Sequence, residues 1–560
     1  MSRTSLFLAL LVGLAGYLAV RLLTVTQFLP IFFDESIYLR WVDFIASEAA
    51  EGWLPLQDGK KPLFFWIVAL LRPLSPDLLR LGRGLSIASG VCLAAVYTRH
   101  AASQSERWFA VLLLVALAFS PYQLLYDRLA LPEGMLCLWT SLLPLLLLFQ
   151  FRDDRPAYGA ALLTGLAAAL AFLTKTTALA HIGLPLLVLP LRHGRKCLGL
   201  LLLYVAPLVA GALLLVVSDV RPGFVGQNLW YFSNAVLLSP SRLLGLPFEV
   251  WWANLVAVFS HLAFLQSPLV LPAAMLGIVE ALRRKRPAAL LMVAHFSLGL
   301  AAIVFLTDTK HVSRYYLTLS PPLLYLACWY LAGKLETTRW SLLLTAVLVV
   351  LLTWPGLRYL TEVPDLPLQA ASFRSEFRED FVGSNQAAVR DALNAFAAKA
   401  GGRVLVLVPF DWGLPTDGLY LELARLDPRL VLLPTWWHFY HGLPLLPARR
   451  LQPVRSTYHR DQVGELIDVA TFSEVLVLRT ASTSNSGSGP PAEGTRPLVS
   501  LRQGAPGTWL YLDRYQVEVL AELRREDRCL HYPQARAQSC DASGDGLATD
   551  EGVPYNGPTP

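Results

Sequence analysis

The hydrophobic and polar positions divide the chain into two parts. From residue 5 to about residue 360, long apolar runs recur and short polar segments separate them. A helix that spans a membrane needs roughly 20 mostly apolar residues, and most of these runs approach that length. Beyond the region of Trp354 the long runs stop. The pattern therefore predicts a helical membrane part followed by a soluble tail.

The apolar runs predict about eleven transmembrane helices. Almost no residues separate the two apolar runs on either side of LTKTT, so the number of helices predicted in this region is uncertain by one. The first run also resembles a secretory signal peptide, but apolar residues resume after Arg21 and no convincing cleavage site follows, which favours an uncleaved helix. The expected spans are 5–24, 80–99, 108–124, 131–151, 157–174, 176–191, 197–217, 262–282, 288–307, 315–333 and 340–358.

The connections between the runs indicate an orientation. If the N-terminus is cytoplasmic, every inside connection is basic, as the positive-inside rule requires. The long first loop, 25–79, and the whole C-terminal tail then lie outside the cytoplasm. The basic connections are Arg99–Arg107, Arg152–Arg155, Arg192–Lys196, Arg283–Arg286 and Lys334–Arg339.

Helical and strand patterns also occur outside the spans. In the first loop, an amphipathic stretch from Glu35 to Ala50 and the short apolar piece PLFFWIVALL are typical of helices that lie in the membrane interface. In the tail, helical patterns at Asn385–Lys399 and TDGLYLELARL alternate with the strand candidates RVLVLV, LVLLP and EVLVLR, which predicts a small α/β domain. The expected domains are the membrane part at 1–360, the α/β domain at 361–480 and a partly disordered tail at 481–560.

Composition agrees with this division and excludes some functions. Of the 560 residues, 54% are hydrophobic and 16% are charged, which is too apolar for an ordinary soluble protein. The formal net charge is only +6, and the basic residues lie between apolar runs without interleaved aromatic residues, so nucleic acid is not an expected partner. The six cysteines form no CxxC pair, and no metal site is predicted from them.

Five polar clusters fall on the predicted outer face, and their convergence there is the main functional signal. Each cluster has an ordinary structural explanation, because acids at a helix start stabilise the helix and lysines beside an apolar segment reach the interface. Cations on this face are nevertheless unexpected under the positive-inside rule, and an ionised acid inside a spanning run needs a partner. The candidate residues are Asp34, Glu35, Tyr38, Lys60, Lys61, Arg128, Glu133, Lys175, Lys310, His311, Arg314, Tyr315 and Tyr316.

The motifs FDES, KKPLFFW, RLALPEGM, GLAAALAFLTKTTAL and SRYYLTLSPPLLYL resemble the GT-C superfamily of membrane glycosyltransferases. The resemblance covers roughly residues 5–335 and points to bacterial lipid A aminoarabinose transferases and protein O-mannosyltransferases. It implies a GT-C-like fold in the bacterial cytoplasmic membrane, with the active site and the C-terminal domain extracytoplasmic. The implied activity is inverting transfer of a hexosyl or pentosyl group from a polyprenyl-phosphate-linked donor to a lipid, glycan or protein acceptor.

The resemblance also implies roles for individual residues. Asp34 corresponds to the catalytic acid of the family, and Glu133 stands where a second acid is expected, although Asp is more usual there. Lys61 matches a lysine implied to approach the carrier phosphate, and Arg314 begins the segment implied to hold the donor. Lys60 occupies a position that is acidic in some relatives and helps them hold a metal. A divalent metal is therefore possible here, but the sequence does not support one.

These residue types suit the implied chemistry. A lipid phosphate is already a leaving group, so transfer needs positive charge beside the departing phosphate and a base for the acceptor proton. Asp34 is the expected base, and Glu35 and Glu133 are the other candidate catalytic groups. The alternative is a transporter or flippase of polyprenyl-linked sugars, but such a protein should carry its ionisable residues near the bilayer midplane. The expected ligands of the donor phosphate are Lys60, Lys61, Lys175, Lys310 and Arg314.

The predicted orientation can be tested with reporter fusions. A reporter joined after Leu360 is expected to be extracytoplasmic and one joined near Arg284 cytoplasmic, because the basic connections stay inside. Alkaline phosphatase activity and green fluorescent protein fluorescence measure the two locations. The reverse result would place Asp34 on the cytoplasmic face and contradict the chemistry inferred from the sequence.

Overall fold

The computed structural model divides into two compact units, each described by itself. The first comprises Met1–Ala387, Trp412–Leu423 and Arg502–Pro506, and the second comprises Ala388–Asp411, Ala424–Leu501 and Gly507–Pro560. The residues that the structure describes are 3–25, 32–47, 52–53, 55–56, 60–75, 77–104, 106, 108–152, 155–219, 238–308, 313–362, 386–408, 426–434, 445–446, 450–451, 467–468, 473–481, 497–500 and 509–514.

The first unit is a bundle of long apolar helices, and each predicted span overlaps one of them. Five stretches are long and apolar enough to cross a membrane by length and composition, namely Leu78–Ala102, Pro132–Phe151, Thr176–Val216, Pro287–Leu306 and Ser341–Arg358. The total number of crossings stays a prediction. The long helices are α1 (Arg3–Thr24), α4 (Leu78–Ala102), α5 (Phe109–Phe119), α7 (Pro132–Leu147), α8 (Tyr158–Thr174), α9 (Leu179–His193), α10 (Cys197–Asp219), α14 (Val270–Arg284), α15 (Pro287–Leu306), α16 (Ser320–Glu336) and α17 (Ser341–Glu362).

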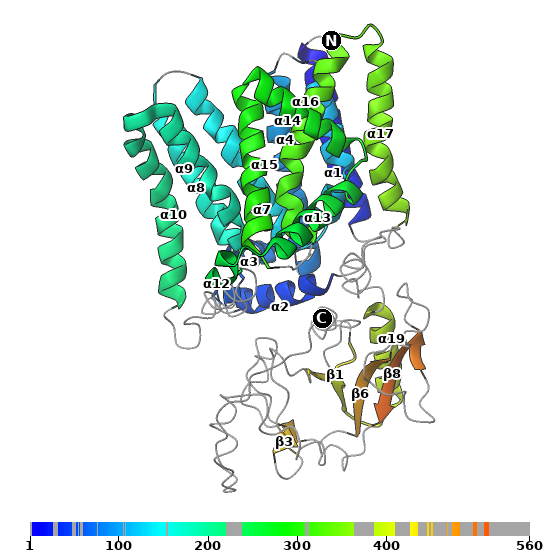
Figure 1. Ribbon diagram of the computed structural model, residues 1–560. Helices are drawn as coiled ribbons and strands as arrows, with labels where there is room; N and C mark the ends of the chain where they lie inside the picture. The colour runs from blue at the N-terminus through cyan, green and yellow to red at the C-terminus, as the bar shows by residue number, and fades with distance from the viewer. Residues whose placement is uncertain are drawn as a thin grey trace. The chain divides into compact units, whose positions relative to one another are not determined.

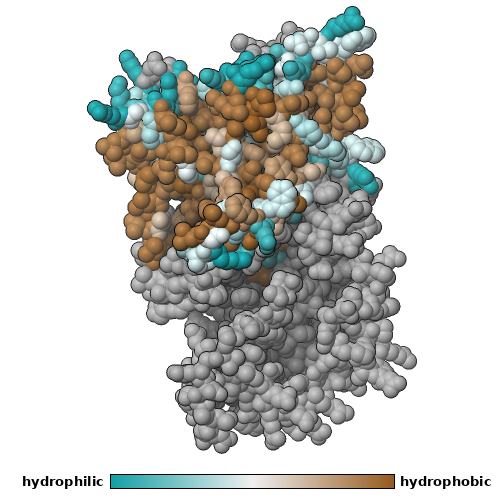
Figure 2. All heavy atoms as spheres, viewed as in Figure 1, coloured by the Kyte–Doolittle hydropathy of each residue, from teal (hydrophilic) through white to brown (hydrophobic). Residues whose placement is uncertain are grey.

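Long helices that follow one another along the chain run in opposite directions, so their connections gather at two ends of the bundle (Figure 1). The basic connections lie at one end and α2 (Phe33–Ser47) lies at the other. Between the ends, apolar side chains cover much of the visible face (Figure 2). Leu198 and Leu202 of α10, for example, are 66% and 63% exposed. Such a belt of exposed apolar side chains is expected where helices face lipid.

A second set of helices builds the end of the bundle opposite the basic connections. In α2 the buried residues Tyr38, Trp41, Val42 and Ile45 follow the spacing of one helical face. This face packs on α3 (Leu63–Leu71), where the ring of Phe65 contacts both aromatic residues. Both interfacial helices predicted in the first loop are thus present as helices. The same end also carries α6 (Pro121–Tyr126), α12 (Pro240–Leu244), α13 (Phe248–Phe264) and the 3₁₀ helices η3 (Arg72–Leu74), η5 (Thr176–Ala178) and η7 (Ser313–Leu319).

Two glycines let neighbouring long helices approach closely. Gly277 of α14 lies against the backbone of Leu326 in α16, and Gly165 of α8 lies against the backbone of Tyr204 in α10. A Cβ atom at either glycine would collide with these main-chain atoms. Small residues at contact positions are the usual means by which helices pack tightly in a membrane.

The second unit contains a mixed β-sheet with the strand order β2-β1-β6-β8-β7. β1 pairs in parallel with β2 and β6, whereas β8 pairs antiparallel with β6 and β7. The predicted helix TDGLYLELARL lies almost entirely outside the described residues, and β7 and β8 lie beyond residue 480 in the segment predicted as a tail. The elements are α19 (Gln386–Lys399), β1 (Val404–Val408), β2 (Leu430–Pro434), β6 (Glu474–Ala481), β7 (Pro497–Ser500), β8 (Trp509–Arg514) and the short strands β3 (Leu445–Leu446), β4 (Arg450–Leu451) and β5 (Ile467–Asp468).

Candidate active site

Four charged residues from separate elements meet at the end of the bundle that carries α2. Asp34 lies in the first turn of α2 and Glu133 in the first turn of α7, where both acids suit the helix dipole. Arg314 of η7 donates through Nη1 to Asp34 Oδ2, and its Nε lies 3.9 Å from Glu133 Oε1. Lys175, between α8 and η5, donates through Nζ to Glu133 Oε1 at 2.5 Å. We call these four residues the charged cluster.

The charged cluster is largely removed from solvent but is not sealed. The side chain of Glu133 is 1% exposed, whereas those of Asp34, Arg314 and Lys175 are 17%, 15% and 18% exposed. Two cations balance two carboxylates, which offsets much of the cost of burying them. Glu133 Oε2 and Arg314 Nε make no hydrogen bond within the described part of the chain. Each therefore keeps hydrogen-bonding capacity for another group.

Aromatic rings border the charged cluster on two sides. The Tyr315 ring centroid lies 4.6 Å from Lys175 Nζ and 5.7 Å from Arg314 Cζ, distances at which a ring face attracts a cation. Tyr38 is buried in α2, stacked on Trp41 at 5.5 Å. Its phenol has a pKa raised well above the ordinary value, mainly by burial, with a lowering contribution from Lys60 and a raising one from Asp34. Tyr38 and Tyr315, two of the five residues predicted to contact the donor or acceptor, thus lie at the charged cluster.

The surroundings keep Asp34 ionised. Burial by itself raises the pKa of the Asp34 carboxyl. The charge of Arg314, the charge of Lys60, the hydrogen bond from Arg314 and the charge of Lys175 lower the pKa, and together they outweigh burial. The net result is a pKa below the ordinary value of Asp. Lys60 therefore lies close enough to act on Asp34 electrostatically and is a fifth charged group at this site.

Glu35 faces away from its neighbour Asp34 and is completely buried. Its two oxygens each accept a hydrogen bond at 2.8 Å from the Arg83 guanidinium, and they also accept from the backbone N–H groups of Phe32 and Ala130. A carboxylate with four donors is well stabilised as an anion. Glu35 thus joins α2 to α4 and to the turn before α7. These bonds fix the first turns of α2 and α7, which carry Asp34 and Glu133.

The remaining predicted residues occupy different surroundings. Lys61 is buried, with Nζ 5.7 Å from the ring centroid of Phe172 in α8. Arg128 is buried and donates from Nε to the carbonyl of Leu124 at 2.5 Å. Tyr316 is buried on the other side of η7 from Tyr315, with its ring 5.1 Å from that of His261. The last two predicted residues, Lys310 and His311, lie outside the described residues.

Sequence reasoning missed Arg83 and the buried pair of Arg21 with Asp127. Arg21 donates from Nε to Asp127 Oδ2 at 2.8 Å, and the Tyr17 hydroxyl donates to the same oxygen at 2.5 Å. Both arginines lie at the ends of apolar helices. An ionisable residue in such a position normally has a partner, and this signal was present in the sequence. As to metals, the described residues contain no group of three or more His, Cys, Asp or Glu placed to hold an ion.

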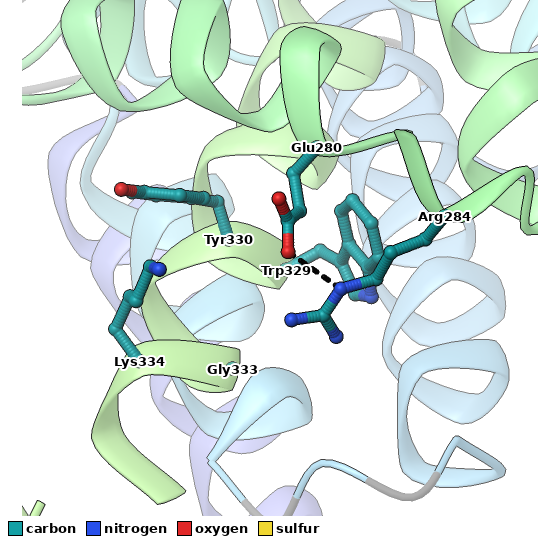
Figure 3. Close-up of a pocket in the computed structure, with 6 residues that line it drawn as sticks. All are labelled: Glu280, Arg284, Trp329, Tyr330, Gly333 and Lys334. Carbon is teal, nitrogen blue, oxygen red and sulfur yellow. Dashed lines mark hydrogen bonds and ion pairs between the residues drawn. The ribbon is translucent and has the colours of Figure 1, made fainter. Parts of the chain in front are cut away.

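A small recess lies far from the charged cluster, between the C-terminal ends of α14 and α16 (Figure 3). Its lining includes Glu280, Arg284, Trp329 and Lys334, and the Arg284 side chain points at Glu280, to which it donates at 2.5 Å. Lys334 is fourteen residues from the start of α16, which corresponds to about 21 Å along the helix. The recess belongs to the end that carries the basic connections and is not part of the candidate active site.

The structural role of Glu35 can be tested by removing its partner. Replacing Arg83 by Met leaves a buried carboxylate without its cation, and breaking such a pair costs about 3–5 kcal/mol. Thermal unfolding in detergent measures this loss. Arg80→Met is the matched control, because Arg80 lies one turn earlier in α4 in an exposed pair with Asp77 whose loss costs about 0–1 kcal/mol. Equal effects of the two changes would contradict the role given to Glu35.

No protein-family model and no curated protein matches the sequence. The structure is nevertheless similar to crystal structures of ArnT from Cupriavidus metallidurans. For the apo state the TM-score is 0.52 with 14% identity, over 91% of this chain and 98% of that chain. For the state bound to undecaprenyl phosphate the TM-score is 0.51 with 15% identity, over 90% and 98%. The chain thus has the fold of ArnT, which confirms the fold expected from the resemblance of the sequence motifs.

Proposed function

We propose that this protein is a membrane glycosyltransferase that moves a hexosyl or pentosyl group from a polyprenyl-phosphate-linked donor to an extracytoplasmic lipid, glycan or protein acceptor. The observation that carries the proposal is the charged cluster, in which residues from α2, α7, η7 and the α8–η5 junction converge. The fold supports the choice of carrier, because one of the similar ArnT structures is bound to undecaprenyl phosphate.

The cations of the cluster suit a phosphate that links sugar to lipid. A guanidinium binds phosphate oxygens through paired N–H donors, and an ammonium acts as a compact point charge. Arg314 and Lys175 already lie side by side against Tyr315, and Lys60 adds positive charge near Asp34. An entering phosphate competes with Asp34 for Arg314, so donor binding frees the Asp34 carboxylate from part of its ion pair.

The reaction then follows from this arrangement. The acceptor oxygen or nitrogen attacks the anomeric carbon from the face opposite the carrier, and Asp34 takes the acceptor proton. The bond from the anomeric carbon to the phosphate oxygen breaks, and its electron pair leaves with the polyprenyl phosphate. Arg314 and Lys175 stabilise the charge that develops on that oxygen. A single displacement of this kind inverts the anomeric centre.

In the proposed mechanism the other two acids have different tasks. Glu133 keeps Lys175 in place through the 2.5 Å hydrogen bond, and its Oε2 can accept from a sugar hydroxyl or amino group. Glu35 is given a structural role and no catalytic one, since its oxygens accept hydrogen bonds from Arg83 and from two backbone N–H groups. Lys61 and Lys310 remain predicted ligands of the donor phosphate, and Arg128 and His311 remain predicted contacts of the donor or the acceptor. A metal has no assigned step.

A transporter or flippase of polyprenyl-linked sugars is the alternative. Such a protein should carry its main ionisable groups near the middle of the membrane, often on interrupted helices. The charged cluster instead lies at one end of the bundle, beside α2, which favours surface chemistry over passage across the membrane.

Mass spectrometry of envelope glycolipids and glycoproteins, with and without the gene, would identify the sugar and the acceptor. Unchanged glycosylation would contradict the proposal.

Asp34→Asn tests the base directly. The amide keeps the shape of the carboxyl and still accepts a hydrogen bond at the helix start, but it cannot take a proton. We expect wild-type insertion and donor binding with a rate of transfer lower by about 10²–10⁴. Transfer of radiolabelled sugar in liposomes measures the rate. Asp43→Asn is the matched control on the same helix, because Asp43 pairs with Arg72 away from the cluster, and it should transfer normally. Full transfer by Asp34→Asn would refute the assignment.

The displacement of Asp34 from Arg314 predicts a particular pH dependence. In the free protein the pKa of Asp34 is lowered, so kcat/KM should fall only at a pH below the ordinary pKa of an aspartic acid. In the donor complex the phosphate charge and burial both favour the protonated carboxyl, so kcat should begin to fall at a higher pH than kcat/KM. Rates measured from pH 9 down to about pH 3 test this order. Coincident acid limbs would show that the phosphate does not compete for Arg314.

A further inference from the structure

The segment that carries Arg314 is a seven-residue 3₁₀ helix, η7, from Ser313 to Leu319. Runs of 3₁₀ helix longer than three or four residues are uncommon, because their hydrogen-bond geometry is poorer than that of an α-helix. Something outside the segment must therefore hold it. Arg314 and Tyr315 of η7 lie at the charged cluster, while Ser313, Tyr316 and Thr318 are buried.

The first residue of η7 is held by two tyrosines of α6. The Tyr122 hydroxyl donates to the backbone carbonyl of Ser313, and the Tyr126 hydroxyl shares a hydrogen bond of 2.5 Å with Ser313 Oγ. The two tyrosines are four residues apart, so both project from one face of α6. They are 0% and 3% exposed. The backbone N–H of Tyr122 in turn donates to the carbonyl of Leu265 at 3.0 Å, which fixes the tyrosine pair to the end of α13.

The far end of η7 is held by a histidine of α9. His181 Nε2 and Thr318 Oγ1 share a hydrogen bond of 2.9 Å, and the His181 ring stacks on that of His295 in α15 with centroids 4.3 Å apart. Both histidines are buried, at 1% and 0% exposure. Gly299 makes room for this arrangement, because a Cβ atom there would collide with the His181 ring. Thr318 is thus tied to a side chain that cannot easily move.

These contacts join η7 to α6 and α9 through groups that are not members of the charged cluster. The proposed reaction removes part of the bond between Arg314 and Asp34 when the donor phosphate enters, so the contact on the cluster side cannot fix the guanidinium throughout the reaction. The hydrogen bonds to Ser313 and Thr318 do not involve any group that the reaction changes. Ser313 precedes Arg314 and Tyr315 in the chain, and Thr318 follows them. Hydrogen bonds at both positions can keep the backbone of η7 in place while Arg314 exchanges Asp34 for the phosphate.

We infer that Tyr122, Tyr126 and His181 are positioning residues for Arg314, and we call them the η7 clamp. The inference rests on the proposed function. The η7 clamp fixes the backbone of η7 and thereby the place of the guanidinium against the departing phosphate. None of the three side chains touches the reacting atoms. Their effect on transfer is therefore indirect and separable from their effect on stability.

The test compares Tyr126→Phe with Tyr204→Phe. Tyr204 is a matched control, because it is also completely buried and donates its hydroxyl to a backbone carbonyl, that of Ile182, at 2.6 Å. We expect both variants to lose a similar amount of thermal stability in detergent. Tyr126→Phe should lower kcat about 10- to 100-fold with little change in KM, since a small misplacement of a catalytic group has an effect of this size. Tyr204→Phe should stay within about twofold of wild type.

Two further measurements separate the η7 clamp from the proposed function. Hydrogen exchange of the peptide that contains 313–319 should rise in Tyr126→Phe and stay at the wild-type level in Tyr204→Phe, and this readout needs no activity. In an Arg314→Lys background, Tyr126→Phe should lower kcat by a much smaller factor than it does in the wild-type protein, because the effects of coupled residues are not additive. If Tyr126→Phe fails to accumulate, Ser313→Ala removes the same hydrogen bond from the other side.

The outcomes are distinct. Equal exchange and equal kcat in Tyr126→Phe and Tyr204→Phe would overturn the η7 clamp while leaving the proposed function intact. Absence of transfer by the wild-type protein from any polyprenyl-phosphate sugar would overturn the proposed function. In that case a selective rise in exchange at 313–319 would still establish that Tyr126 holds η7, and an unchanged exchange would remove both conclusions.

Discussion

The cost of burying charge governs how this end of the bundle is built. An ion taken out of water costs several kcal/mol, and the cost is offset only if an opposite charge with good hydrogen bonds lies beside it. Each of the buried acids described at this end has a cation from a different element of the bundle. The resulting ion pairs act as cross-links between separate elements of the bundle. They are Glu35–Arg83, Asp127–Arg21, Asp34–Arg314 and Glu133–Lys175.

The ion pairs differ in their solvent exposure and in the number of hydrogen bonds that they make. This difference separates the pairs that hold the helices together from those proposed to take part in the reaction. Glu35 and Arg83 are buried and make multiple bonds, so exchanging either partner would leave a stranded charge. The pair of Asp34 with Arg314 retains about one-sixth of its side-chain exposure, and Arg314 Nε makes no bond within the described residues. A cation with this access can change partner at modest cost. The same physical rule thus yields a rigid joint in one place and an exchangeable contact in another.

The sequence predicted the helices of the bundle, since their apolar runs are local and long. It also predicted the residues of the charged cluster, because polar groups beside spanning runs are conspicuous. It did not predict the pairing. Asp34 and Arg314 are 280 positions apart, and no local pattern relates them. The divergence of Asp34 and Glu35 does follow from the sequence, because adjacent residues on a helix do not share a face. Which of two adjacent lysines, Lys60 or Lys61, acts on Asp34 depends likewise on packing between elements.

The pair of Arg21 with Asp127 has a consequence for biosynthesis. Arg21 leaves the ribosome 106 residues before the carboxylate that neutralises it, and it also donates to the carbonyls of Leu117 and Ala118, where α5 ends. Until those later residues have entered the membrane, the guanidinium of α1 must stay at the water boundary or be shielded by the insertion machinery. α1 can therefore dock through Arg21 only after the chain up to Asp127 has been made, and its docking reports that the end of α5 and the residue after α6 have reached their places.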